Sequence, residues 1–119
     1  MRALIVDDDK TSCRLLAKIL ESKGLDAEWT TDSLAGYNLS LQRHYDLFIL
    51  DVRMPLLLGT ELAESLKKEN PQAKIVLISA FADEALQRTA ANLGVSLLSK
   101  PFTPERLLKV TAEVLGQAT

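Results

Sequence analysis

Four short apolar stretches of the chain each lead into a side chain that could take part in chemistry. They are residues 3–6 before Asp7, Asp8 and Asp9, 47–50 before Asp51, 75–78 before Ser79, and 95–99 before Lys100. At the ends of parallel strands, these groups would form a small acidic pocket with one cation at its rim. Magnesium prefers a few carboxylate oxygens together with water and phosphate oxygens. The pattern therefore predicts a Mg²⁺ site suited to phosphoryl chemistry.

The apolar stretches must be strands if they are to bring these groups together. Uninterrupted apolar runs are typical of strands buried on both faces, whereas residues 26–30 alternate and fit a strand at or near an edge. Helical patterns lie between the strands, at residues 11–23, 33–42 with Ser33 as the cap, 59–69, 83–93 and 103–115. This alternation predicts an α/β domain with a doubly wound parallel sheet, (βα)5, and helices on both faces.

Composition narrows the class of protein. The chain has 119 residues, enough for one domain with its own core, and we expect residues 1–119 to form a single domain. A net charge of −2 gives no general attraction to nucleic acid, and no apolar run is long enough to span a bilayer. We therefore expect a cytoplasmic protein that does not bind nucleic acid or membranes. The single cysteine, Cys13, fits a buried apolar position.

Four motifs, taken together, resemble those of one protein family. In chain order they are Val6-Asp7-Asp8, Asp51-Val52-Arg53-Met54-Pro55, Ile78-Ser79-Ala80 and Lys100-Pro101-Phe102. Each motif alone is weak, but in this order and at these strand ends they resemble the receiver domain of two-component response regulators. The resemblance covers the whole chain and implies a flavodoxin-like fold with strand order 2-1-3-4-5.

The resemblance also implies a phosphoacceptor and a metal site. Asp51 would accept a phosphoryl group from the phosphohistidine of a sensor histidine kinase or a phosphotransfer protein. Asp7, Asp8, Asp51 and the backbone carbonyl of Arg53 would hold Mg²⁺, which offsets repulsion between the carboxylates and the phosphoryl oxygens. Such a domain is not an enzyme in the usual sense, since it catalyses only its own phosphoryl uptake and release.

Other matched positions would bind the phosphoryl group and transmit the signal. Ser79, Ala80 and Lys100 would contact the phosphoryl oxygens, with the Ser79 hydroxyl moving as the switch. The peptide bond between Lys100 and Pro101 is expected to be cis, as in the family. Arg53 and Phe81 would lie at the pocket rim, where a bulky ring would exclude water.

Two departures from the family pattern concern leucines. Leu97 stands where the family usually has an aromatic partner of the hydroxyl switch, so loop movement should carry more of the response here. Leu56, Leu57 and Leu58 occupy a turn that is normally polar. They would form an exposed apolar knuckle for protein contacts, or Leu57 and Leu58 would pack against the third helix.

Two alternative functions remain open. A phosphatase of the haloacid-dehalogenase type also uses an aspartate nucleophile and Mg²⁺, but it needs a second carboxylate where this chain has Arg53. A pseudo-receiver, an interaction module that takes no phosphate, usually lacks one of the motif residues, and all are present here. Considered singly, Asp7 and Asp8 could cap the first helix, as we expect Asp9 to do, and Ser79 and Lys100 could be ordinary surface groups.

The resemblance gives only a general view of the partners. Members of the family commonly associate as homodimers through the fourth helix, fifth strand and fifth helix. The downstream effector, as a domain or a separate protein, is not specified by the sequence.

Overall fold

A computed structural model describes residues 1–116 and contains five strands and five helices in strict alternation. The strands are β1 (Arg2–Val6), β2 (Asp26–Thr30), β3 (Leu47–Asp51), β4 (Ile75–Ser79) and β5 (Ser96–Ser99). The helices are α1 (Lys10–Glu21), α2 (Ser33–Gln42), α3 (Gly59–Glu69), α4 (Glu84–Leu93) and α5 (Pro104–Leu115). The predicted number and type of elements are confirmed.

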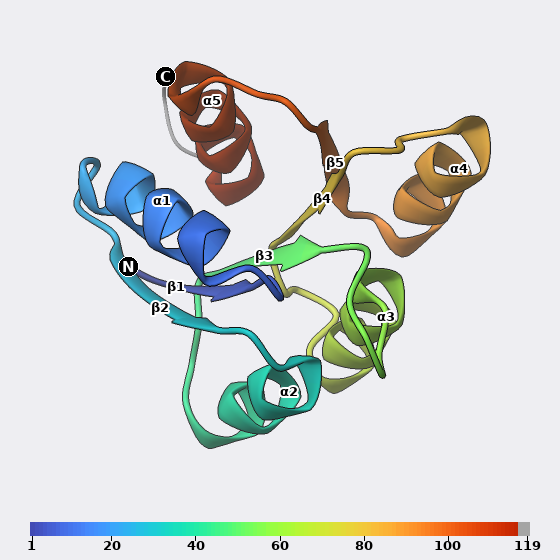
Figure 1. Ribbon diagram of the computed structural model, residues 1–119. Helices are drawn as coiled ribbons and strands as arrows, with labels where there is room; N and C mark the ends of the chain where they lie inside the picture. The colour runs from blue at the N-terminus through green and yellow to red at the C-terminus, as the bar shows by residue number, and fades with distance from the viewer. Residues whose placement is uncertain (117–119) are drawn as a thin grey trace.

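The strands form one parallel sheet in the order β2-β1-β3-β4-β5, so the predicted flavodoxin-like topology is also confirmed. Alternate residues of each inner strand face opposite sides. Ala3 and Ile5 join a core with α1 and α5, whereas Leu4 and Val6 join a second core with α2, α3 and α4. Figure 1 shows these two helical layers on either side of the sheet. Both faces are covered, which explains the continuous apolar runs.

Local signals set the helix starts. Asp9 caps α1 by accepting a hydrogen bond from Thr11 N at 3.0 Å, as the sequence suggests for this residue. The prediction that Ser33 caps α2 is wrong, because the cap is Asp32, whose Oδ1 accepts from Leu34 N at 2.9 Å. Ser33 instead lies buried in the first turn. Two neighbouring polar residues compete for such a cap, and the sequence does not rank them.

No helix among residues 1–116 combines the length and apolar character required to cross a membrane.

Candidate phosphoryl and metal site

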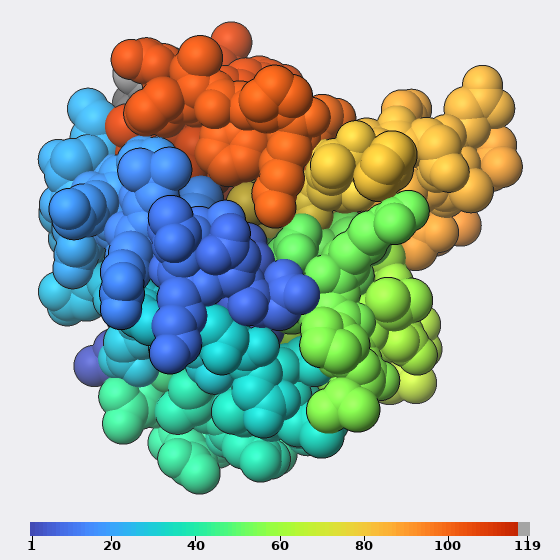
Figure 2. All heavy atoms as spheres, viewed as in Figure 1, coloured from blue at the N-terminus to red at the C-terminus, as the bar shows by residue number. Residues whose placement is uncertain are grey.

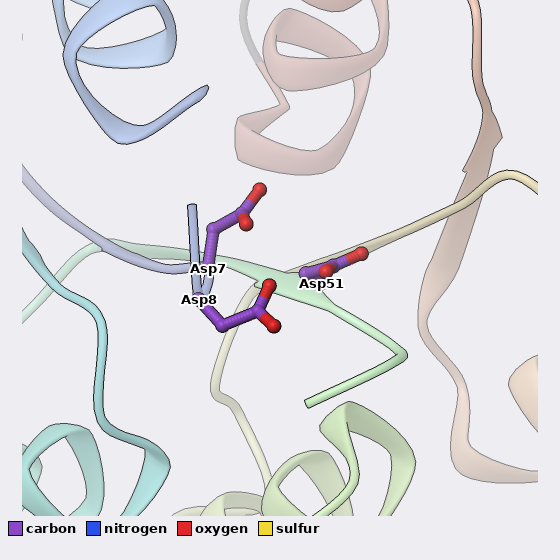
Figure 3. A group of neighbouring side chains, drawn as sticks. All are labelled: Asp7, Asp8 and Asp51. Carbon is purple, nitrogen blue, oxygen red and sulfur yellow. The ribbon is translucent and has the colours of Figure 1, made fainter. Parts of the chain in front are cut away.

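The sheet register brings the acidic residues level with one another. Val6 is paired with Leu50, so the loop after β1 begins beside Asp51, the last residue of β3. Each of Asp7, Asp8 and Asp51 offers one carboxylate oxygen within 4.8 Å of the other two. Figure 3 shows Asp7 and Asp8, from the loop after β1, beside Asp51 at the end of β3. The predicted acidic cluster therefore exists as a compact group.

Burial disfavours the ionised form of the carboxylates in this cluster unless positive charge lies nearby. Asp7 is only 1% exposed and Asp51 only 8%, whereas Asp8 is exposed. Burial raises the pKa of Asp7, and burial together with the negative charge of Asp7 raises the pKa of Asp51. The site thus favours the binding of a proton or a cation.

Lys100 is the cationic side chain paired with these carboxylates within residues 1–116. Its Nζ lies 3.5 Å from Asp51 Oδ1 and 3.8 Å from Asp7 Oδ2. Its backbone N–H donates to the carbonyl of Ser79 at 2.8 Å, which fixes the start of the loop after β5 beside the end of β4. The bond between Lys100 and Pro101 is cis, as expected. Lys100 therefore forms ion pairs with two buried carboxylates.

One buried carboxylate oxygen at the site fits the role of a metal ligand. Asp7 Oδ1 accepts a hydrogen bond from Asp9 N at 3.0 Å. The other oxygen, Oδ2, is buried and accepts no hydrogen bond from any described residue. An unsatisfied buried carboxylate oxygen is costly, and hard oxygen donors are the ligands that Mg²⁺ prefers. The donor set of Asp7, Asp8 and Asp51 thus fits a hard divalent cation.

The hydroxyl group predicted for the site lies at the end of β4, the strand next to β3. Ser79 is 2% exposed, and its Oγ accepts a hydrogen bond from the backbone N–H of Phe81 at 3.0 Å. Ala80 is exposed and begins the loop that leads to α4. Asp51 is paired with Ile78, so Ser79 lies one residue beyond the position of Asp51 on the neighbouring strand. Such a placement suits a hydroxyl that reaches a group attached to Asp51.

Two further predicted rim residues contact each other. Arg53 lies in the loop after β3, and its guanidinium carbon is 4.5 Å from the centre of the Phe81 ring. Both residues are exposed, and the loops that carry them border the same face of the molecule (Figure 2, green and yellow). The contact between them could not be inferred from either motif alone.

Leu97 lies on β5 and is half-buried. It packs against the core formed with α2, α3 and α4, so the fifth strand presents an aliphatic side chain toward α4. The apolar knuckle is only partly as predicted. Leu56 is 86% exposed and Leu58 is 45% exposed, whereas Leu57 packs against the same core.

Sequence reasoning missed one residue that shapes the site. Gly59 begins α3, and its N–H donates to the carbonyl of Val52 at 2.9 Å. A Cβ at this position would clash with the Asp51 carbonyl oxygen and lie 2.8 Å from the Asp51 carbonyl carbon. The glycine therefore lets α3 approach the backbone of the candidate nucleophile. A glycine at the start of a predicted helix is the signal that could have identified it.

Comparisons with known proteins agree with this geometry. The model of the family described as response regulator receiver domain matches residues 3–112. The transcriptional regulatory protein RprY of Bacteroides fragilis is 32% identical over 108 residues, which cover 90% of this chain and 46% of RprY. The chain thus spans about half the length of that relative.

Solved structures give the same result. A CheY-like response regulator receiver domain protein from Methanospirillum hungatei has a TM-score of 0.91 at 29% identity, with 97% of this chain and 93% of that chain covered. The response regulator TrrA of Thermotoga maritima, solved in complex with Mg²⁺ and BeF, has a TM-score of 0.86 at 26% identity. That match covers 95% of this chain and 97% of TrrA.

Proposed function

This chain belongs to the receiver domains of two-component response regulators, and from that premise we propose that Asp51 is its phosphoacceptor. The observation that carries the proposal is the pairing of a nearly buried Asp51 with Lys100 at 3.5 Å, beside the carboxylates of Asp7 and Asp8. A carboxylate held at a strand end by one lysine is oriented for nucleophilic attack and is protected from bulk water.

The proposed reaction transfers a phosphoryl group from a phosphohistidine. An oxygen of the Asp51 carboxylate attacks phosphorus, the bond from phosphorus to the imidazole nitrogen breaks, and an acyl phosphate forms. Lys100, 3.5 Å from that carboxylate, would turn to a phosphoryl oxygen once Asp51 is phosphorylated. The Ser79 hydroxyl would donate to a second phosphoryl oxygen, and the backbone N–H of Ala80 would lie beside the same group.

We further propose that Asp7, Asp8, Asp51 and the Arg53 carbonyl hold Mg²⁺. The unsatisfied Oδ2 of Asp7 supports this assignment. Bound there, the ion would neutralise the carboxylates and the phosphoryl oxygens that gather on one side of Asp51. The complex of TrrA with Mg²⁺ and BeF is a precedent for such a ligand pair in a similar structure.

The signal would leave through the surface formed by α4, β5 and α5. A groove on this surface is lined by Leu97, Phe102 and Arg106, among others. We propose that this surface changes on phosphorylation and contacts a second copy of the chain or a downstream effector. The phosphoryl donor would be a sensor histidine kinase or a phosphotransfer protein.

Intact-protein mass spectrometry tests the proposal. Incubated with Mg²⁺ and a small acyl-phosphate donor, the protein should gain the mass of one phosphoryl group, and Asp51→Asn should gain none. Unmodified protein under these conditions would favour the pseudo-receiver alternative. Equal labelling of the Asp51→Asn variant would place the acceptor elsewhere. Steady release of phosphate from a phosphomonoester would instead favour the phosphatase alternative.

A further inference from the structure

Cys13 is buried, as the sequence pattern predicts, but its thiol contacts polar atoms of the backbone. Its Sγ lies 3.2 Å from the carbonyl oxygen of Asp7 and 3.9 Å from that of Thr30. Asp7 follows β1, and Thr30 is the last residue of the neighbouring strand β2. A thiol has one proton and is a weak donor, so the nearer carbonyl, that of Asp7, is its main acceptor.

The carbonyl group that accepts this bond belongs to the peptide unit between Asp7 and Asp8. These are two of the three acidic residues that we assign to the metal. A peptide unit is planar, so the direction of its carbonyl group also fixes the direction in which the chain continues to the next residue. A donor that holds the Asp7 carbonyl therefore limits how Asp8 is presented to the site.

Two other hydrogen bonds hold Asp7 in place. Its N–H donates to the Thr30 carbonyl at 3.3 Å, and its Oδ1 accepts from Asp9 N at 3.0 Å. Together with the thiol, they hold the peptide units on both sides of Asp7 and one of its carboxylate oxygens. The buried Oδ2 has no hydrogen bond from a described residue. A ligand that is fixed in this way loses little freedom when it binds a cation.

The thiol is suited to donation and not to covalent chemistry. Burial, with a smaller effect from the negative charge of Asp7, raises the pKa of Cys13 to about 11. The side chain therefore keeps its proton at neutral pH. A buried, protonated thiol is also a poor nucleophile, so the contacts of Cys13 favour a structural connection between α1 and the acidic loop.

We propose that Cys13 is a positioning residue of the metal site, because its thiol donates to the Asp7 carbonyl and holds the peptide unit between Asp7 and Asp8 in the orientation that binds Mg²⁺. This inference rests on the metal site proposed above. Cys13 does not contact the ion in this arrangement and acts only through the backbone. A side chain that merely fills the core contributes volume, whereas a positioning side chain here must contribute a proton donor.

Three substitutions of Cys13 separate the donor from the volume. Cys13→Ser keeps a donor, whereas Cys13→Ala and Cys13→Val have none and are smaller and larger than cysteine. Titration with Mg²⁺, followed through the amide resonances of residues 7–9, gives the dissociation constant for each. Cys13→Ser should bind Mg²⁺ as the parent does, and the Ala and Val variants should bind it about three- to tenfold more weakly. This is less than for a partner of the ligand atom itself, because the thiol is a weak donor.

Urea unfolding without metal should rank the variants differently. A hydroxyl buried among apolar side chains is less favourable than an alkyl group, so Cys13→Ser should be less stable than Cys13→Val. The donor thus predicts one order for Mg²⁺ affinity and packing predicts the opposite order for stability. Mg²⁺ affinities that follow the order of stability, or that equal the parent in both Ala and Val variants, would overturn the proposal.

A matched control destabilises the same helix without altering a bond to the acidic loop. Ala17 is buried on α1, one turn beyond Cys13, and Ala17→Gly should lower stability but leave the Mg²⁺ dissociation constant unchanged. Weaker binding by Ala17→Gly, equal to that of Cys13→Ala, would show that any loosening of α1 has this effect and would overturn a specific role for the thiol.

Infrared spectroscopy tests the hydrogen bond itself. The chain has one cysteine, so its S–H stretching band is assigned without labelling. The band should lie at lower frequency than that of a free thiol, because donation weakens the S–H bond. A band at the free-thiol position would overturn the proposal. Failure of the parent to bind Mg²⁺ would instead reject the proposed metal site, so the two failures are distinguishable.

Discussion

The ammonium group of Lys100 lies 3.5 Å from Oδ1 of Asp51, although β5 and β3, the strands that lead to these two residues, are not neighbours in the sheet. Lys100 follows β5, Asp51 ends β3, and β4 separates the two strands. The lysine therefore reaches across the end of the intervening strand. The positive charge of Lys100 lies close to the carboxylates of Asp7 and Asp51, which we also propose as ligands of the metal. Lys100 and the metal ion therefore compete for the same two carboxylates.

Lys100→Met should change metal binding and phosphorylation in opposite directions. Removal of a positive charge 3.5 to 3.8 Å from two carboxylates should strengthen Mg²⁺ binding, on the order of tenfold. The rate of labelling at Asp51 should fall, because a contact to the phosphoryl group is lost. Calorimetric titration with Mg²⁺ and intact-mass labelling measure the two effects. Weaker Mg²⁺ binding in the variant would contradict the assigned position of the metal.

Gly59→Ala should destabilise the fold and disturb the site together. The added Cβ would clash with the Asp51 carbonyl oxygen, and backbone atoms cannot move aside as a side chain can. We expect a loss of about 3 kcal/mol in the free energy of unfolding, measured with urea, and slower labelling of Asp51. The neighbouring substitution Thr60→Ala should change both quantities little. If Gly59→Ala were as stable as the parent, α3 could move away from β3 with little loss of folding free energy.

Asp8→Asn and Asp9→Ala should separate the metal site from the helix cap. Without metal, Asp8→Asn should raise the melting temperature, because it removes repulsion with Asp7 and Asp51. It should also abolish the stabilisation that Mg²⁺ gives the parent. Asp9→Ala should cost about 1 kcal/mol through loss of the cap but keep the response to Mg²⁺. The reverse pattern in thermal unfolding would mean that Asp9, not Asp8, binds the metal.

Asp46 should contribute stability that depends on pH. Its Oδ2 accepts a hydrogen bond from the backbone N–H of Arg2 at 2.8 Å, and this bond holds the pKa of Asp46 below the ordinary aspartate range, with His44 adding a smaller effect. A lowered folded-state pKa gives stability that is present above the unfolded-state pKa and is lost as pH falls through the folded-state value.

The matched experiment compares Asp46→Ala with the parent by urea unfolding. At pH 7 the variant should be less stable by about 1 kcal/mol, since the carboxylate is partly exposed. The difference should shrink as pH falls below the ordinary aspartate range. Asp26→Ala, which removes an exposed carboxylate from β2, should give little difference at either pH. If the stability difference between Asp46→Ala and the parent instead grew as the pH fell, the protonated carboxyl group of Asp46 would form the stronger contact with Arg2.

Leu97 should limit how far the fifth strand responds to phosphorylation. It is a half-buried aliphatic residue with no hydroxyl, so it gains little by exchanging a buried rotamer for an exposed one. Beryllofluoride should therefore shift the amide resonances of residues 79–86 strongly and those of Leu97 weakly. Leu97→Tyr should enlarge the response of β5. A rotamer change of Leu97 as the dominant event, with the loop after Ser79 unmoved, would disprove this account of the switch.

The sequence was sufficient for the parts of the site that depend on strand ends. In a parallel sheet, every strand delivers its last residue to the same edge, so placing Asp51 at the end of a buried strand also placed it beside Asp7. The cap at Asp9 was likewise a local property. Strand order followed from the family resemblance, since the alternating pattern fits several orders.

Features that depend on contacts between distant segments were not accessible from the sequence. The approach of Gly59 to the Asp51 backbone depends on how α3 is placed, and the stack of Arg53 on Phe81 depends on two loops. The difference between exposed Leu56 and packed Leu57 has the same origin. Leu56 adopts a φ of 71°, in the left-handed region, so successive leucines do not share one direction. The helical and strand periodicities that predict burial in regular elements do not apply in such a turn.

The two edge strands of the sheet limit how this domain can join another chain. β2 carries the acidic residues Asp26 and Glu28, and Glu28 is paired with Arg2 and Arg43. β5 has only four residues, and Pro101, which has no N–H to donate, lies two residues beyond its end. Short, charged or proline-terminated edges are poor templates for an added strand. Copies and partners of this domain should therefore recognise side chains on its helices and loops, and the sheet should resist growth into fibres.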